Sequence, residues 1–193
     1  YFKEVSMHSY WSGADTKKNA ENYFSDKYSK YSVAATEYCQ MTDDKNTGVY
    51  DLIAKEKNGT NGTSIKYGVA MANTIVDDLT IMNANEWDWW TACSYGTYTD
   101  GLIYLDEDNH ENLDFSKRYY CLGNFSKFIK EGAVRVACSS GVKNVRSVAF
   151  VNEDNTVVTV YVNNNDKKAY TTIDCEGDYA VYTTDRDNDI AKT

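Results

Sequence analysis

The chain has 193 residues, of which 42% are hydrophobic and 25% charged, so its composition is that of a folded globular protein. Its formal net charge of −9 argues against a nucleic-acid partner and against an anionic membrane surface, because both attract basic proteins. No apolar run is long enough to predict a membrane-spanning helix.

Two further features of the composition bear on the kind of site to expect. With only His8 and His110, and with five cysteines that form no Cys-X-X-Cys pair, a metal site is not expected. The 17 tyrosines and 4 tryptophans can stack on sugar rings, but tyrosine also fills the surfaces of ordinary β-sheets. Composition alone favours the second interpretation.

Strand-like and helical segments alternate in the first half of the chain. Residues 15–31 carry apolar side chains at helical spacing, and Asp15 or Thr16 can cap this helix. Ser64 can cap a second helix, whose apolar stripe is formed by Ile65, Val69, Ala72, Ile75, Val76 and Leu79. Strands are predicted over residues 5–11, 33–39 and 85–90, with loops over 42–63 and from 91 to 101. This order is typical of parallel βα units, in which barrel enzymes place their chemistry at the C-terminal ends of the strands.

The second half of the chain has a different pattern. An amphipathic helix is predicted over residues 116–129. Short strands separated by Asn- and Asp-rich turns are predicted over residues 133–137, 145–151, 156–163, 169–173 and 178–183. Such strands indicate an antiparallel sandwich. The sequence therefore predicts an α/β part over residues 1–112 and an all-β sandwich domain over residues 113–193.

A carboxylate at the end of the second predicted strand is the first candidate for chemistry. Glu37 follows an apolar run, where burying its charge costs free energy unless the group is hydrogen-bonded or used. His8 and Tyr10 lie two residues apart on the first predicted strand and would share a face, from which they can orient a carboxylate or contact a sugar hydroxyl. The alternative interpretation makes Glu37 an ordinary surface residue and His8 a packed or surface histidine.

Three tryptophans crowd the end of the third predicted strand. Trp87 and Trp89 would share one face, and Asp88 and Trp90 the other. One of the indoles could form the floor of a sugar site, whereas the alternative is core packing on both faces.

Several of these segments together resemble one enzyme family. Val5–Tyr10 is similar to the sixth barrel strand of glycoside hydrolase family 30, where a His-X-Tyr motif lines the active site. Ala35–Cys39 resembles the seventh strand, which carries the nucleophile, and Asn85–Trp89 the eighth, whose tryptophan contacts the sugar. The most specific match is Lys117–Arg135, which is similar to the helix and sandwich strand after the barrel. The resemblance implies the C-terminal βα units of a (β/α)8 barrel followed by an antiparallel β-sandwich.

The resemblance also implies an activity, that of a retaining β-glycosidase working by double displacement. Glu37 matches the nucleophile of the family. The residues expected to contact substrate are His8, Tyr10, Trp11, Tyr38 and Trp89. No metal and no organic cofactor are implied. The motifs look closest to microbial endo-acting members that cut β-1,6-galactan, β-1,6-glucan or xylan. The expected partner is therefore a β-linked polysaccharide or oligosaccharide, and the expected location is extracellular, with no signal peptide in this chain.

The acid/base glutamate of the family lies on the fourth barrel strand, and neither Glu4 nor Glu86 matches its motif. The chain corresponds to family members only from about the sixth strand onward. Three arrangements follow: pairing with the N-terminal half as a separate chain, being the remainder of a longer enzyme, or assembly with copies of itself. The alternative function is a non-catalytic carbohydrate-binding or assembly fragment.

Overall fold

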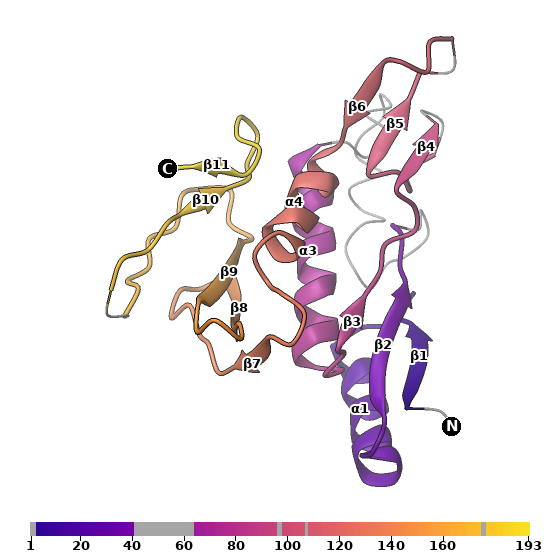
Figure 1. Ribbon diagram of the computed structural model, residues 1–193, viewed down its shortest axis with the longest axis vertical. Helices are drawn as coiled ribbons and strands as arrows, with labels where there is room; N and C mark the ends of the chain where they lie inside the picture. The colour runs from indigo at the N-terminus through magenta and orange to yellow at the C-terminus, as the bar shows by residue number, and fades with distance from the viewer. Residues whose placement is uncertain (1–2, 41–63, 96–97, 107, 175–176) are drawn as a thin grey trace.

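A computed structural model describes residues 3–40, 64–95, 98–106, 108–174 and 177–193. Three parallel strands, β1 (Glu4–His8), β2 (Ser32–Glu37) and β3 (Glu86–Trp87), lie side by side in that order (Figure 1). Helix α1 (Ala14–Tyr28) connects β1 to β2, and helix α3 (Ile65–Thr80) precedes β3. The predicted alternation of parallel strands and helices is confirmed. The predicted loop over residues 42–63 lies outside the described residues.

The helix boundaries differ from the prediction at α1 and agree at α3. Helix α1 is capped by Gly13 rather than by Asp15 or Thr16, and Asp15 lies in the first turn, where its charge favours the positive end of the helix. Ser64 is the cap of α3, as predicted, and its carbonyl oxygen accepts the Tyr67 N–H at 3.1 Å.

Helix α3 occupies the middle of the molecule, between the β1–β3 sheet and the strands of the second half (Figure 1). The predicted apolar stripe faces the core: Ala72, Ile75 and Val76 are buried. The same core includes residues of the following helix and strands, namely Cys121, Phe125, Val148, Phe150, Val160 and Val162. Burial of this stripe against two neighbouring elements is what holds the two halves of the chain together.

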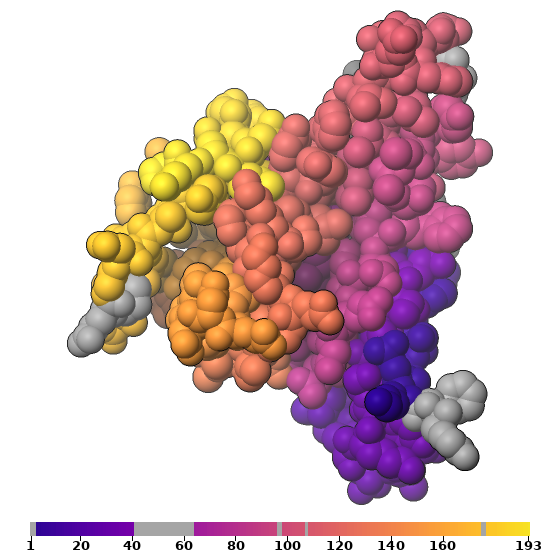
Figure 2. All heavy atoms as spheres, viewed as in Figure 1, coloured from indigo at the N-terminus to yellow at the C-terminus, as the bar shows by residue number. Residues whose placement is uncertain are grey.

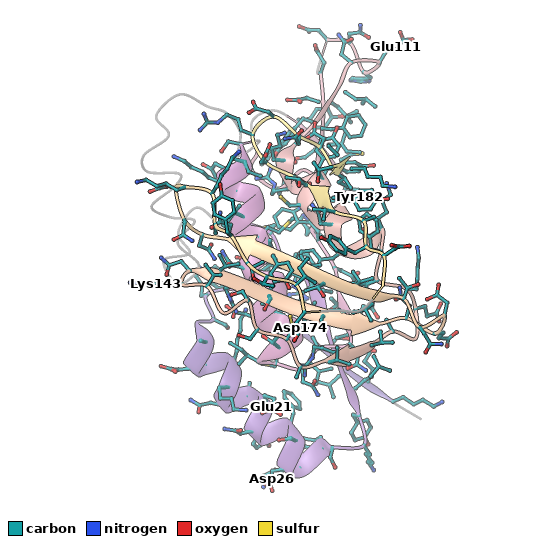
Figure 3. All side chains as sticks on the ribbon, turned by 90° about the vertical axis from the view of Figure 1, so that its left-hand side faces the viewer. Glu21, Asp26, Glu111, Lys143, Asp174 and Tyr182 are labelled. Atoms are coloured by element: carbon teal, nitrogen blue, oxygen red, sulfur yellow. The ribbon has the colours of Figure 1, made fainter. Side chains whose placement is uncertain are left out.

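A small sheet replaces the loop predicted after the third strand. Strand β4 (Cys93–Tyr95) pairs in parallel with β5 (Ile103–Leu105), and β5 pairs antiparallel with β6 (Leu113–Phe115). The prediction of a loop from 91 to 101 was partly wrong. Strands of three residues are too short to show a periodic pattern. The β5–β6 hairpin projects from the rest of the molecule, with Glu111 near its far end (Figures 2 and 3).

Helix α4 (Lys117–Ser126) follows β6 and ends three residues earlier than predicted. Three antiparallel strands come next, β7 (Val134–Val136), β8 (Val145–Val151) and β9 (Val157–Asn163), in the order β7-β8-β9. They match three of the predicted strands to within a residue or so. Val148 and Val160 face each other in the ladder and are both buried, which accounts for the alternating pattern of β9.

The end of the chain forms a two-stranded antiparallel pair, β10 (Tyr182–Thr183) with β11 (Ala191–Lys192). The strand predicted over residues 169–173 is not formed, since its side chains are exposed, with Tyr170 84% accessible, and have no apolar face to bury. The described residues thus form a mixed α/β fold of two- and three-stranded sheets. The predicted division between residues 112 and 113 falls inside the β5–β6 hairpin and stays a prediction.

Gly68 allows α3 and α4 to approach closely. A Cβ atom at this position would lie 2.6 Å from Cys121 Sγ and 3.1 Å from the Lys117 carbonyl oxygen. Gly68→Ala should therefore lower the free energy of unfolding by about 1–2 kcal/mol, because overpacking outweighs the gain in helix propensity. Urea denaturation measures this effect. Adding Cys121→Ala to Gly68→Ala should cost less than Cys121→Ala costs alone, and equal costs would contradict the packing argument.

Candidate active site

Glu37 ends strand β2 on the same face of the sheet as His8. The register of β1 and β2 pairs Ser6 with Ala34 and Met7 with Ala35, but then shifts so that His8 pairs with Glu37. Paired residues in neighbouring parallel strands point to the same face. Strict alternation along β2 would put Glu37 on the face of Ala35, so the irregularity at the strand end determines which face the carboxylate occupies.

Two of the predicted site residues contact the Glu37 carboxylate. The Tyr10 hydroxyl donates a hydrogen bond to Glu37 Oε1 at 3.1 Å. His8 Nδ1 lies 3.8 Å from the same oxygen, close enough for an ion pair whenever the imidazole is protonated. The Glu37 side chain keeps 32% of its surface accessible, and that of His8 48%. The Glu37 side chain is thus contacted at Oε1 and remains partly accessible to solvent, as a nucleophile requires.

Tyr10 reaches Glu37 from a turn rather than from the strand. Strand β1 ends at His8, so the prediction that Tyr10 continues the strand was wrong, although both side chains reach the same carboxylate. The Tyr10 ring stacks on Tyr38 with centroids 5.3 Å apart, and its hydroxyl lies 3.6 Å from Cys39 Sγ. Burial, together with the neighbouring thiol and carboxylate, raises the pKa of Tyr10 well above its usual value. Tyr10 therefore stays protonated and acts as a donor toward Glu37.

The other predicted substrate contacts differ in how far solvent reaches them. Tyr38 is fully buried and packs against Tyr10, against Trp87 at the end of β3 and against Trp89 just beyond it. Trp89 is half-buried and donates its indole N–H to the Asp100 carbonyl oxygen at 2.6 Å. Trp11 lies beside Tyr10, with centroids 5.5 Å apart, and is 48% exposed.

Trp90, absent from the expected substrate contacts, is the more accessible indole at this end of the sheet. It is 55% exposed, and its backbone N–H continues the ladder to the Tyr38 carbonyl oxygen at 2.9 Å. Glu86 of β3 pairs with Ala34, which shares the face of His8, so the same alternation continued past Trp87, the last residue of β3, would put Trp90 on that face. In the sequence, the alternation that separates Trp90 from Trp87 and Trp89 was the signal that could have indicated this position.

A buried arginine contacts the segment that follows β2. Arg118 on α4 is fully buried and donates to Gln40 Oε1 at 3.0 Å and to the Gly101 carbonyl oxygen at 2.9 Å. Its guanidinium also lies 5.5 Å from the ring centre of Trp89. Burial lowers the pKa of Arg118 below its usual value, with Tyr104 among the groups that oppose this shift. Arg118 thus fixes both Gln40, three residues after Glu37, and the loop that follows β4.

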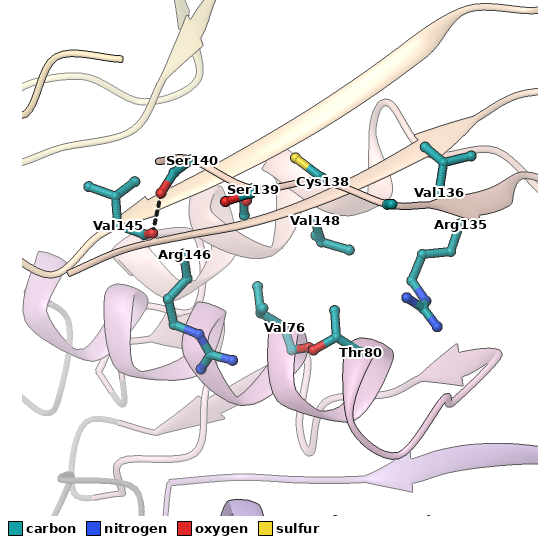
Figure 4. A pocket seen from close by; sticks show the side chains of 12 residues that line it. Val76, Thr80, Arg135, Val136, Cys138, Ser139, Ser140, Val145, Arg146 and Val148 are labelled. Carbon is teal, nitrogen blue, oxygen red and sulfur yellow. Dashed lines mark hydrogen bonds between the residues drawn. The ribbon is translucent and has the colours of Figure 1, made fainter. Parts of the chain in front are cut away.

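A cavity of about 420 Å³ lies elsewhere, between α3 and the β7–β8 strands (Figure 4). Arg135 and Arg146 extend along its wall toward α3, and both have partners: Arg135 donates to Asn83, and Arg146 pairs with Asp77. None of the residues expected to contact substrate lines this cavity. It belongs to the junction of α3 with the strands and not to the Glu37 site.

Within the ranges that the structure describes, no three His, Cys, Asp or Glu side chains are grouped so that they could hold a metal ion. The four cysteines that are described, Cys39, Cys93, Cys121 and Cys138, form no disulfide. No helix in the described part of the chain is long and apolar enough to cross a bilayer.

Comparison with known families identifies the chain. The profile of O-Glycosyl hydrolase family 30 matches residues 2–104, and that of the Glycosyl hydrolase family 30 beta sandwich domain matches residues 132–188. The first match alone spans more than half of the chain and includes Glu37, His8, Tyr10 and Trp89. The chain therefore belongs to glycoside hydrolase family 30, as its motifs predicted.

Solved structures share the fold. A conserved exported protein from Bacteroides fragilis is 24% identical with a TM-score of 0.82, and the match covers 99% of this chain and 42% of that one. A family 30 endoxylanase from Clostridium papyrosolvens is 21% identical, with a TM-score of 0.69 and the same coverages of 99% and 42%. An endo-β1,6-glucanase is 16% identical, with a TM-score of 0.55 and coverages of 98% and 39%. The chain thus spans less than half the length of these relatives.

Arg118 offers a test of how the site is supported. Arg118→Lys should lower the free energy of unfolding by about 3 kcal/mol, because an ammonium group cannot replace the forked contacts to Gln40 and Gly101. Chemical denaturation measures this loss. Arg186→Lys, at an exposed position, is the matched control and should change stability by no more than about 0.5 kcal/mol. Equal effects of the two changes would contradict the structural role of Arg118.

Proposed function

We propose that this chain is the nucleophile-bearing part of a retaining β-glycosidase. Its three parallel strands correspond to the sixth, seventh and eighth strands of a (β/α)8 barrel, and its antiparallel strands to the associated sandwich domain. The observation that carries the proposal is the partly exposed Glu37 side chain at the end of β2, with its carboxylate held by the Tyr10 hydroxyl and His8 beside it. Membership of the family supports this assignment.

The reaction has two steps. In the first, the Glu37 carboxylate attacks the anomeric carbon, the bond to the leaving oxygen breaks, and a second carboxyl group protonates that oxygen. In the second, the same group removes a proton from water, which displaces Glu37 and retains the anomeric configuration. The second carboxyl group must stand about 5–5.5 Å from Glu37 and belongs to a part of the protein outside this chain.

Tyr10 has a defined task in the first step. Because it remains protonated, it donates to the charged form of Glu37 before attack and leaves the other carboxylate oxygen for the sugar carbon. His8 lies beside the same oxygen and can contact a sugar hydroxyl through its exposed edge.

The proposed substrates are β-linked polysaccharides cut internally, namely β-1,6-galactan, β-1,6-glucan or xylan. Xylanase and endo-β1,6-glucanase activities appear among the names of the structural relatives. Action on such polymers places the protein outside the cell, in line with the exported relative.

Glu37→Gln should reduce turnover about a thousandfold or more, because an amide oxygen is a far weaker nucleophile than a carboxylate. Release of reducing ends from the three polysaccharides, side by side, measures this in the active protein that contains the chain. Glu21→Gln is the control, since Glu21 lies on α1 at the opposite end of the molecule from the projecting hairpin (Figure 3) and should keep the wild-type rate.

Full activity in Glu37→Gln would disprove the nucleophile assignment. Oligosaccharide binding without turnover in the wild-type protein would instead favour the alternative, a non-catalytic carbohydrate-binding fragment.

The two adjacent tryptophans should respond differently to truncation. We expect Trp90→Ala to raise KM about tenfold with little effect on stability, because an exposed indole can stack on a sugar ring. Trp89→Ala should lower the free energy of unfolding by about 2–4 kcal/mol as well as weakening substrate binding, because this ring also packs on the core. Steady-state kinetics and urea denaturation of both variants separate the two effects. Unchanged KM in both would remove the tryptophans from the substrate site.

A further inference from the structure

Asp78 is a fully buried carboxylate on α3 that the proposed reaction does not use. Burying a charged group is costly unless it is paired and hydrogen-bonded. The partner is Lys17 on α1, itself only 2% exposed, whose Nζ lies 2.7 Å from Asp78 Oδ1. The ion pair thus joins two helices beneath the parallel sheet.

The second oxygen of Asp78 accepts two hydrogen bonds from the sheet. Ser9 Oγ donates at 2.8 Å and Trp87 Nε1 at 2.9 Å, both to Oδ2. Ser9 follows the end of β1, and Trp87 is the last residue of β3. One carboxylate therefore connects the ends of the two strands that flank β2, whose last residue is Glu37.

Ser9 lies between the two residues that contact Glu37. Its neighbours in the sequence are His8 and Tyr10, and its carbonyl oxygen accepts the Ser12 N–H at 3.3 Å, which closes the turn that carries Tyr10. Ser9 is only 3% exposed, so water does not compete for the hydrogen bond from its hydroxyl to Asp78.

A second set of contacts connects Tyr10 to the same tryptophan. The Tyr10 ring stacks on Tyr38, and Tyr38 packs on Trp87 with centroids 6.0 Å apart. Ser9, Asp78 and Trp87 form one side of a closed ring of contacts, and Tyr10 and Tyr38 form the other.

We propose that Asp78, balanced by Lys17, is a positioning residue that fixes the Tyr10 hydroxyl on Glu37. The inference rests on the proposed function, since it assigns Asp78 a task in the same reaction. Small displacements at a reacting centre have large effects on rate, because alignment of the reacting groups accounts for much of the catalysis. Asp78 never touches the sugar and acts through Ser9 and Tyr10.

Ser9 gives a sharper test than Asp78 itself. Substituting Asp78 would leave the Lys17 ammonium buried without its carboxylate, which destabilises the fold for reasons unrelated to positioning. Ser9→Ala removes a single hydroxyl and leaves the ion pair in place. Thr74→Val is the matched control, because it removes another buried hydroxyl of the same region, one that bonds only the Ala70 carbonyl of its own helix.

In the active protein that contains the chain, Ser9→Ala should lower kcat about tenfold with KM nearly unchanged, the effect of losing one hydrogen bond. Ser9→Thr, which keeps the hydroxyl, should restore most of the rate, and Thr74→Val should keep it. In a Tyr10→Phe background, Ser9→Ala should have no further effect on kcat, since the group that it positions is already gone.

Additive losses in the Ser9→Ala/Tyr10→Phe double variant would overturn the proposal, and so would an equal loss in Thr74→Val. The crystal structure of Ser9→Ala supplies a readout independent of turnover. A Tyr10 hydroxyl displaced from Glu37 supports the positioning role, and an unmoved hydroxyl refutes it. Wild-type turnover in Glu37→Gln would refute the proposed function instead, so the two failures are distinguishable.

Discussion

Helix α3 must be buried on two faces at once, and the rest of the structure follows from how each face is satisfied. The face toward the second half of the chain is apolar, with Met71, Ile75 and Val76 in contact with α4 and with β8 and β9. The face toward the parallel sheet carries Asp78, a charge that water cannot reach. Hydrophobic burial is non-directional, whereas a buried carboxylate demands particular donors at particular distances. The apolar face therefore brings the two halves of the chain together. The face that carries Asp78 determines how the parallel sheet lies on α3.

The consequence for the site is that its geometry depends on elements far from it in the sequence. Glu37 is the last residue of β2, and its partner Tyr10 belongs to a turn whose Ser9 is hydrogen-bonded to Asp78, the ion-pair partner of Lys17. Beyond the end of β2, Arg118 connects Gln40 to Gly101, which precedes β5. Contacts of this kind hold the carboxylate in one orientation, which the role proposed for Glu37 as nucleophile requires.

The described residues present an open face around Glu37. His8 and Glu37 are part-exposed on the same side of the sheet, and the chain spans less than half the length of its structural relatives. In the proposed reaction, the second carboxyl group approaches from this open side. The proposed reaction requires the sugar and the acid/base group to meet at the accessible side of Glu37.

The sequence by itself determined the elements whose pattern is local. The apolar stripe of α3, the alternation in β9 and the alternation of parallel strands with helices all come from periodicities of a few residues, and the structure contains each of them. Motif order was sufficient to assign the family, and residue type together with motif made Glu37 the expected nucleophile. Short strands such as β4 and β5 could not be predicted, because three residues carry no periodic signal and their pairing depends on distant partners.

Tertiary structure alone decided the rest. The register shift between β1 and β2 puts Glu37 on the face of His8, and no spacing in the sequence indicates that shift. Charged residues such as Lys17, Asp78 and Arg118 look like surface residues in a sequence, since only the packed fold supplies the partners that make their burial tolerable. The same is true of Trp89 and Trp90, adjacent in the chain, of which packing covers the first in part and leaves the second exposed. The sequence predicted the chemistry, and long-range contacts place the Tyr10 and His8 side chains within reach of Glu37.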